Sequence, residues 1–168
     1  DIDADGDADL IVQGSDGAVN RLDKYLNDGT GVFSAPSGFG TATGSGSLSI
    51  ADIDGDGDLD LVATGAAGAG RQLDRYLNDG SGNFGGASLG QGVYNPATSL
   101  GDIDGDGDID IIVSGAQSAG GGTKHLETWL NNGAGSFTGP NSFGTVIYLS
   151  AHSMGDIDND GDIDLIVS

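Results

Sequence analysis

The sequence predicts an all-β protein built from four-stranded blades of the β-propeller type. Three observations predict it. A unit of about fifty residues recurs along the 168-residue chain, each unit contains short β-branched runs bounded by turn-forming residues, and no segment shows a sustained helical period. A solenoid of stacked repeats is the rival architecture.

An aspartate-rich loop marks the period. It reads DIDADGDAD at 1–9, DIDGDGDLD at 52–60, DIDGDGDID at 102–110 and DIDNDGDID at 156–164, so the copies begin 51, 50 and 54 residues apart. A second motif repeats in phase with the first: LDKYLNDGTGVF at 22–33, LDRYLNDGSGNF at 73–84 and LETWLNNGAGSF at 126–137. One supersecondary unit is therefore reused along the chain.

Each unit is interpreted as four strands, A to D. Strand A is a short segment before the loop, at 47–51, 97–101 and 151–155, and strand B is the apolar run directly after the loop, such as LVATG or IIVSG. These runs are too short for an independent helix and are typical of buried strands. Strand C then enters a hairpin in which Asn-Asp-Gly supplies positive φ, and strand D begins at Phe33, Phe84 or Phe137.

This interpretation divides the chain into blade 1 (1–46, strands B, C and D), blade 2 (47–96), blade 3 (97–150) and a partial blade 4 (151–168, strands A and B). Pro36, Pro96 and Pro140 are expected outside the strands. Thirteen strands make about three and a half blades, whereas closed propellers use about 4–8. Since the chain also begins inside a motif, we expect it to be a piece of a longer propeller, an open array, or one part of an oligomer.

The negative charge is concentrated in the loops. They hold twenty of the 26 acidic residues of a chain whose formal net charge is −21. Two carboxylates about 4 Å apart repel by about 4 kcal/mol at an effective dielectric of 20, so the clusters need a positive counter-charge. A basic protein partner is one source of that charge, but the strict spacing of aspartates around a glycine suits a small, hard cation with oxygen ligands better.

Several other classes of protein are disfavoured. Five Lys and Arg residues give no electrostatic footprint for nucleic acid. The absence of Cys excludes disulfides and thiolate metal sites. No apolar run reaches the about 18 residues of a membrane span.

The loop pattern D-x-D-x-D-G-x-x-D predicts calcium sites. A sharp turn at the glycine brings side chains 1, 3, 5 and 9 around one point, while position 7 offers its main-chain carbonyl. Oxygen-only ligation excludes a zinc-type site, and a flexible loop rich in ligands favours Ca²⁺ over Mg²⁺. We predict up to four Ca²⁺ sites, with the sharp turns at Gly6, Gly57, Gly107 and Gly161. The predicted ligands, with the position-7 carbonyl last in each set, are Asp1, Asp3, Asp5, Asp9 and Asp7; Asp52, Asp54, Asp56, Asp60 and Asp58; Asp102, Asp104, Asp106, Asp110 and Asp108; Asp156, Asp158, Asp160, Asp164 and Asp162.

Two other calcium motifs do not fit. An EF-hand needs a Glu at position 12 and flanking helices, but position 12 is Val12, Ala63, Val113 or Val167 in a β-type run. Nonapeptide calcium rolls repeat every nine residues, not every fifty.

The stretch SLSIADIDGDGDLDLVATG, followed by RYLNDGSGNF, resembles the FG-GAP or VCBS repeat, the blade unit of integrin alpha-chain β-propellers and of many secreted bacterial proteins. The resemblance covers essentially the whole chain. It implies that each calcium loop joins strands A and B at the edge of a ring, with the ligands given above. Propellers of that family commonly have seven blades, which this chain does not supply.

The remaining polar and aromatic residues favour structural roles. Asp23, Asp74 and Glu127 are equivalent repeat positions, as are Asp28, Asp79 and Asn132, and His125 and His152 lack a nucleophile signature around them, so we expect no enzyme. The histidines are expected at the surface or between blades. Tyr25, Tyr76 and Trp129 align, which favours packing between blades; a sugar-stacking platform is the alternative.

The functional expectation is a calcium-binding, non-enzymatic repeat module of an extracellular or cell-surface protein, serving as a structural or adhesive scaffold. Its partner would be a protein or glycan surface, or a second copy that associates through the incomplete end blades. One alternative is a carbohydrate-binding propeller, or a propeller attached to a polysaccharide-active enzyme. Another is a structural subunit of a surface filament or matrix. We expect neither nucleic-acid binding nor membrane insertion.

Overall fold

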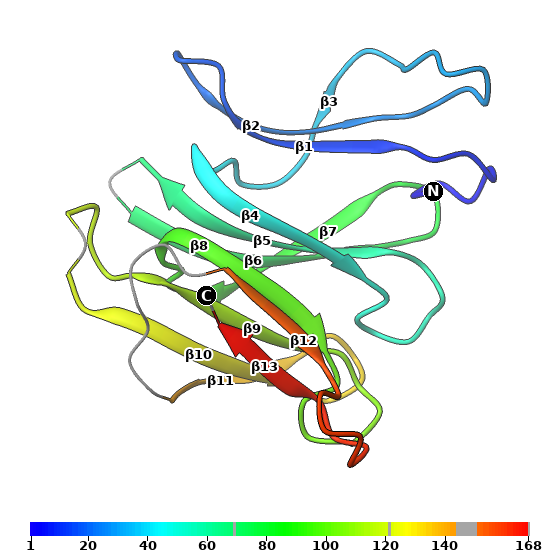
Figure 1. Ribbon diagram of the computed structural model, residues 1–168. Helices are drawn as coiled ribbons and strands as arrows, with labels where there is room; N and C mark the ends of the chain where they lie inside the picture. Colours follow the sequence, from blue (N-terminus) through cyan, green and yellow to red (C-terminus); the bar gives the residue numbers. More distant parts are fainter. Residues whose placement is uncertain (69, 121, 144–150, 168) are drawn as a thin grey trace.

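The computed structural model describes residues 1–68, 70–120, 122–143 and 151–167, and their regular structure is entirely β (Figure 1). Blade 1 contains β1 (Leu10–Ser15), β2 (Asn20–Tyr25) and β3 (Ser37–Gly38). Blade 2 contains β4 (Ser45–Ala51), β5 (Asp60–Ala67), β6 (Gly70–Asn78) and β7 (Phe84–Gly90). Blade 3 contains β8 (Tyr94–Gly101), β9 (Asp110–Ala116), β10 (Lys124–Asn131) and β11 (Phe137–Ser142), and blade 4 contains β12 (His152–Gly155) and β13 (Asp164–Val167).

Each blade is a separate antiparallel sheet with sequential neighbours. The strand orders are β1-β2-β3, β4-β5-β6-β7, β8-β9-β10-β11 and β12-β13. This confirms the all-β class, the four-stranded sheets and the predicted inventory of strands. The described residues close no ring, so the number of blades in a complete propeller stays a prediction.

Within the described ranges, no helix is long and apolar enough to cross a bilayer.

The sheets stack in chain order, from the blue sheet of blade 1 to the orange and red hairpin of blade 4 (Figure 1). Strand β4 contacts β8, and β8 contacts β12, so the A strands of consecutive blades lie side by side. This arrangement brings the segments that precede the aspartate loops to neighbouring positions.

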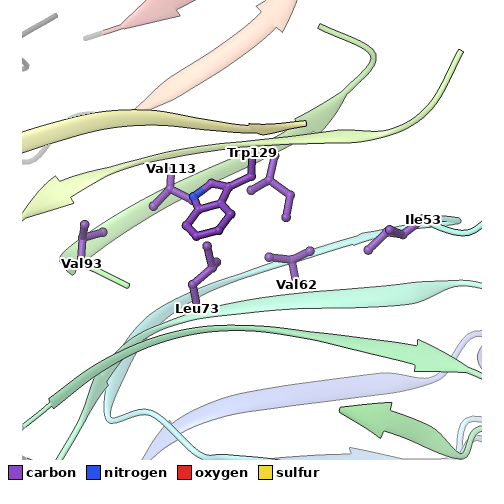
Figure 2. Close-up of a cluster of buried hydrophobic side chains, with 7 residues drawn as sticks. Ile53, Val62, Leu73, Val93, Val113 and Trp129 are labelled. Atoms are coloured by element: carbon purple, nitrogen blue, oxygen red, sulfur yellow. The ribbon is translucent and has the colours of Figure 1, made fainter. Parts of the chain in front are cut away.

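Strand B packs on both of its faces, which explains its continuous apolar run. Successive side chains of a strand point to opposite sides of the sheet. In β5, Leu61 and Ala63 pack with Leu22 of blade 1, whereas Val62 packs in a cluster with Trp129 of blade 3. Figure 2 shows Trp129 facing Val62 and Leu73 across the space between the two sheets.

We call the packed surface between two consecutive blades a seam. The 1–2 seam holds Leu22, Leu61, Ala63 and Tyr76; the 2–3 seam holds Ile53, Val62, Leu73, Val93, Ile111, Val113 and Trp129; the 3–4 seam holds Ile112 and Leu126, with Met154 and Leu165 packed against them. Full burial of a large aliphatic or aromatic side chain stabilises by about 1.5–3 kcal/mol. The seams are therefore the hydrophobic core of the protein.

The expected placement of two prolines was wrong. Pro96 lies in β8 and Pro140 lies in β11, although Pro36 does fall outside the strands. Both strands are at the edges of the blade 3 sheet, and each pairs with a register shift beside the proline, between Tyr94 and Ala97 and between Thr128 and Leu130. Proline lacks an N–H donor, and an edge strand or a bulge does not need one at every residue.

Several strand boundaries also differ from the prediction. Strands β4 and β8 begin at Ser45 and Tyr94, before the expected 47 and 97. Phe84 and Phe137 begin strand D as predicted, but Phe33 forms only an isolated bridge with Asn27, and β3 follows later as a two-residue strand. Pro36 lies between that bridge and β3. Because proline has no backbone N–H, it cannot donate a hydrogen bond to the neighbouring strand at this point.

Candidate metal centre

Four aspartate loops occupy equivalent places in the blades. Loop 1 (1–9) leads into β1, loop 2 (52–60) joins β4 to β5, loop 3 (102–110) joins β8 to β9, and loop 4 (156–164) joins β12 to β13. Loops 2 to 4 therefore lie between strands A and B of one sheet, as expected from the sequence.

The glycine at position 6 makes the predicted turn in every loop. The φ angle is +95° at Gly6, +96° at Gly57, +95° at Gly107 and +98° at Gly161. Residues that carry a side chain rarely adopt this region of φ, whereas glycine adopts it freely. In loop 2 the pivot N–H donates to Asp52 Oδ2 at 3.0 Å, so the backbone wraps around the first aspartate.

The last aspartate of loops 1 to 3 is anchored by two backbone N–H groups. In loop 2, Ile53 N donates to Asp60 Oδ2 at 2.8 Å, and Asn78 N donates to Asp60 Oδ1 at 2.7 Å. Asp110 is held in the same way in loop 3, and both carboxylates have no exposed surface. Because each carboxylate oxygen has two lone pairs, these bonds leave acceptor capacity for a cation.

Carboxylates converge in all four loops. In each group that the structure brings together, one oxygen atom from every member lies within 4.8 Å of the others. Positions 1 and 3 take part in every group; position 5 joins them in loop 1 and position 9 in the other loops. The groups are Asp1, Asp3 and Asp5; Asp52, Asp54 and Asp60; Asp102, Asp104 and Asp110; Asp156, Asp158 and Asp164.

The other predicted ligands have local partners. In loop 2, Asp58 N donates to Asp56 Oδ1 at 2.9 Å, a bond that shapes the loop. The side chain of Asp58 lies against Gly80 of the C–D turn, where an added Cβ would be 2.5 Å from Asp58 Oδ2. Asp7 and Asp108 meet Gly29 and Gly133 in the same way. Coordination through the position-7 carbonyl stays a prediction.

Burial and mutual repulsion disfavour the charged form of several loop carboxyls. The pKa of Asp54 is raised by desolvation and then by the charges of Asp56 and Asp52. Burial also raises the pKa of Asp60, in spite of its two N–H donors. In loop 3, desolvation followed by neighbouring charge raises the pKa of Asp104 and of Asp108. A bound cation would favour the ionised carboxylates and reverse this effect.

Unpaired oxygens in two loops also fit a cation. Asp3 Oδ1 and Asp54 Oδ1 are buried and have no hydrogen-bond partner. Both belong to position 3, whose carboxylate lies within the converging group of its loop. Buried acceptors of this kind ordinarily have a partner, and oxygen-only sites are typical of Ca²⁺.

Sequence reasoning missed the asparagine that ends strand C. It assigned the Asn-Asp-Gly stretch to the hairpin turn alone. In the structure Asn78 is 4% exposed, and its backbone N–H holds the last aspartate of loop 2. The signal was available, since Asn27, Asn78 and Asn131 occupy the same place in all three copies of the motif.

The acids outside the loops have structural surroundings. Asp74 and Glu127 are buried residues of strand C, where Glu127 accepts a hydrogen bond from His125 Nδ1 at 2.8 Å and Asp74 Oδ2 lies 3.4 Å from the Tyr76 hydroxyl. Asp79 accepts the N–H of Ser81 in the C–D turn. These contacts agree with the structural roles expected for the repeated acids.

His152, Tyr76 and Trp129 lie between blades, whereas His125 contacts Glu127 of its own strand. His152 of β12 contacts Ser99 Oγ of β8 through Nδ1 at 2.7 Å, so it is an inter-blade residue as expected. Tyr76 and Trp129 are 2% and 5% exposed, which agrees with packing between blades and leaves no ring face for a sugar to stack on. The Tyr76 hydroxyl accepts the N–H of Thr41 from the neighbouring blade at 2.8 Å.

The comparisons with known proteins identify the repeat. A family model described as FG-GAP-like repeat matches residues 1–63 and 102–167, which include all four loops. No curated protein matches the chain significantly.

Proposed function

Because the chain belongs to the FG-GAP-like repeat family, we propose that it is a calcium-binding module of an extracellular or cell-surface protein, in which one Ca²⁺ per loop stabilises each blade. The observation that carries the proposal is the convergence of three carboxylates in each of four loops, within 4.8 Å of one another. The ion's role is structural, since it neutralises charge where strands A and B meet.

The donor set favours calcium over other metals. The convergent ligands are all carboxylate oxygens, whereas zinc sites use His and Cys. Ca²⁺ takes 6–8 oxygen ligands in flexible geometry, and an open loop with exposed aspartates can complete such a shell with water and a carbonyl. Mg²⁺ demands a stricter octahedron and keeps more of its waters.

The energetics suit an extracellular module. Calcium at about 100 times its Kd would add about 2.7 kcal/mol per site. Several occupied sites would together rival the about 5–15 kcal/mol net stability of an ordinary domain. Extracellular calcium modules bind with Kd of about 10⁻⁴–10⁻³ M, which matches calcium outside the cell. We therefore propose a scaffold or adhesion module with no catalytic role, whose partner is a protein or glycan surface.

A calcium titration with melting curves tests the proposal. Up to four sites are expected by calorimetry, with a rise in melting temperature that EDTA reverses and that equimolar Mg²⁺ does not reproduce. Asp54→Asn should remove one site. Asp16→Asn removes the same charge from an exposed turn outside the loops and should leave every site intact. A chelated protein that melts at the same temperature as the calcium-treated protein would overturn the proposal.

End-to-end self-association is a second candidate, favoured by the two end faces. Leu10 and Val12 are 45% and 39% exposed, although the equivalent side chains of blades 2 and 3 are buried in seams. At the other end, Ile157 and Ile166 are 58% and 52% exposed. The two faces are the halves of a contact that consecutive blades already make within the chain.

Sedimentation over a range of concentrations tests this candidate. Leu10→Glu should abolish the association, because it places a charge in the face of blade 1 on which a second copy would dock. Val32→Glu places the same charge at a residue that is 62% exposed in the C–D turn, outside that face, and should leave association unchanged. A protein that stays monomeric at every concentration would remove the candidate.

A further inference from the structure

We propose that the asparagine at the end of strand C couples the calcium loop of its own blade to the loop of the preceding blade, so that neighbouring sites bind calcium cooperatively. The inference rests on the proposed function, since it concerns the same loops. It assigns Asn78 and Asn131 a positioning role across the seams.

Asn78 connects loop 2 with loop 1. Its backbone N donates to Asp60 Oδ1 at 2.7 Å within blade 2. Its side-chain Nδ2 donates to the carbonyl of Ile2, in loop 1, at 2.8 Å. Both bonds are buried, so one residue contacts two candidate calcium sites from inside the 1–2 seam.

Asn131 repeats the connection one blade further along. Its backbone N donates to Asp110 Oδ1 at 2.8 Å, and its Nδ2 donates to the carbonyl of Ile53, in loop 2, at 2.7 Å. The same amide also donates to Ile109 O at 3.0 Å in its own loop. Since the two asparagines are equivalent in the repeat, the bridge is a property of the unit and not of one seam.

The accepting carbonyl lies between two metal-binding positions. Ile2 stands between Asp1 and Asp3, and its own N–H donates to Asp9 Oδ2 at 2.8 Å. Both polar groups of the Ile2 backbone are therefore fixed, one from within the loop and one from the next blade. Outer-shell partners of this kind orient the residues that bind the ion.

These bonds form an unbroken network through three loops, in which the first step is part-buried and all the others are buried. It runs from Asp9 to Ile2, Asn78, Asp60, Ile53, Asn131 and Asp110, with every step between 2.7 and 2.8 Å. Hydrogen bonds in a low-dielectric interior polarise one another. An ion that fixes the last aspartate of one loop also fixes the asparagine that orders the preceding loop.

The turn after the asparagine contacts both loops as well. Its first glycine, Gly80, lies against Asp58 of its own loop. Its second, Gly82, lies against the preceding loop, since an added Cβ would be 3.5 Å from Asp3 Cβ. Gly135 has the same relation to Asp54, at 3.6 Å. Backbone packing therefore supports the coupling independently of the hydrogen bonds.

Blade 1 provides a matched control. Asn27 donates its N–H to Asp9 in the same way, but its side-chain amide donates to Ala8 O, at 3.1 Å, in its own loop. Among the described residues, the Asn27 side-chain amide donates only within its own blade. Asn27→Ala therefore removes the same side chain without removing a bridge.

Calcium isotherms of the full chain test the coupling. The wild type should bind with a Hill coefficient above 1. Asn131→Ala should weaken binding at loop 2 by about 10- to 100-fold, the usual loss when an outer-shell partner is removed, and should bring the Hill coefficient toward 1. Asn27→Ala should leave the coefficient unchanged. If Asn131→Ala does not fold, as judged by circular dichroism, Asn78→Ala gives the same test at the 1–2 seam.

Amide exchange in EDTA adds a readout that needs no metal. The Ile53 N–H should exchange faster in Asn131→Ala, although the substitution lies in the next blade, and should be unchanged in Asn27→Ala. A wild type that binds no calcium overturns the proposed function together with this inference. Calcium binding without cooperativity in the wild type, or an isotherm and exchange pattern that Asn131→Ala leaves unchanged, overturns this inference alone.

Discussion

Asp60 accepts the backbone N–H of Asn78 at 2.7 Å, deep in blade 2, and so joins the end of the aspartate loop to the end of strand C. The other oxygen of the same carboxylate accepts Ile53 N at 2.8 Å. A carboxylate in this place holds the loop and the sheet together whether or not an ion is bound. The last position of the loop is therefore part of the fold as well as of the candidate site.

Replacing Asp60 should destabilise the protein even without metal. Asp60→Ala leaves two buried N–H donors unpaired, and each should lower the free energy of unfolding by about 1–3 kcal/mol. Asp56→Ala removes an exposed carboxylate of the same loop that accepts only a local bond, so its effect in EDTA should be small. Urea denaturation in EDTA measures both. Equal losses in the two variants would refute the structural role of Asp60.

The chelated protein should lose stability as pH rises through the pKa of Asp54. Its pKa is raised in the folded state above the ordinary value of 3.8, first by desolvation and then by Asp56. A group with a raised folded pKa stabilises below its unfolded pKa, and this contribution is lost as pH rises through the folded pKa. Calcium should reverse the trend, because its ligands must be deprotonated.

A difference measurement isolates this effect. Exposed acids act in the opposite direction; hydrogen bonds from Val19 and Ala18 lower the pKa of Asp16 to about 2. The free energy of unfolding of the wild type minus that of Asp54→Asn should therefore be followed from about pH 4 to 7, in EDTA and in calcium. We expect the difference to fall with pH in EDTA and to rise in calcium. A rise in EDTA would contradict the burial and repulsion described for this loop.

Gly80→Ala should destabilise blade 2 more than a glycine substitution with the same backbone angle. Gly80 has φ +75°, and an added Cβ would lie 2.5 Å from Asp58 Oδ2. Gly55 has φ +76°, but an added Cβ there would have no atom within 4 Å. Both variants carry the about 1–2 kcal/mol cost of a left-handed side chain. Only Gly80→Ala should add a further loss in urea denaturation, and equal losses would show that the turn does not press on the loop.

Trp129→Ala should weaken the 2–3 seam. Trp129 is 5% exposed and packs with Leu73 and Val62 of the preceding blade, so truncation should lower the free energy of unfolding by about 3–5 kcal/mol. Phe33→Ala, at an aromatic residue that is 44% exposed, should have a smaller effect. Thermal melts compare the two. A mild Trp129→Ala variant would mean that the aromatic position is not a core residue.

Local chemistry in the sequence was sufficient to predict the order of the strands and the turns of the loops. The glycine pivots, the strand B runs and the C–D turns each have one favoured conformation, and all three are confirmed. The prolines were misplaced because the rule that excludes proline from strands assumes that the strand has a hydrogen-bonded neighbour on both sides, so that every N–H is needed. Pro96 and Pro140 lie in edge strands, and which strands form the edges is set by the sheet as a whole.

The sequence pattern did not predict which residues of neighbouring blades bond to each other. The alignment of Tyr76 and Trp129 indicated packing between blades, but nothing in the chain specified that Asn78 reaches Ile2, 76 residues away. Such a bond depends on how two sheets are offset, which is a tertiary property. Repetition of the asparagine marked it as important, without saying whether its backbone, its side chain or both were used.

The alternation along β5 has a consequence for how such a chain can change its length. Leu61 and Ala63 face one neighbouring sheet and Val62 faces the other. A single-residue insertion ahead of them would turn Leu61 and Ala63 toward blade 3 and Val62 toward blade 1. Each neighbouring sheet would then meet side chains of the wrong size. Tandem duplication of the entire unit keeps both sets in phase, so genes of this kind should grow and shrink by complete copies of about fifty codons.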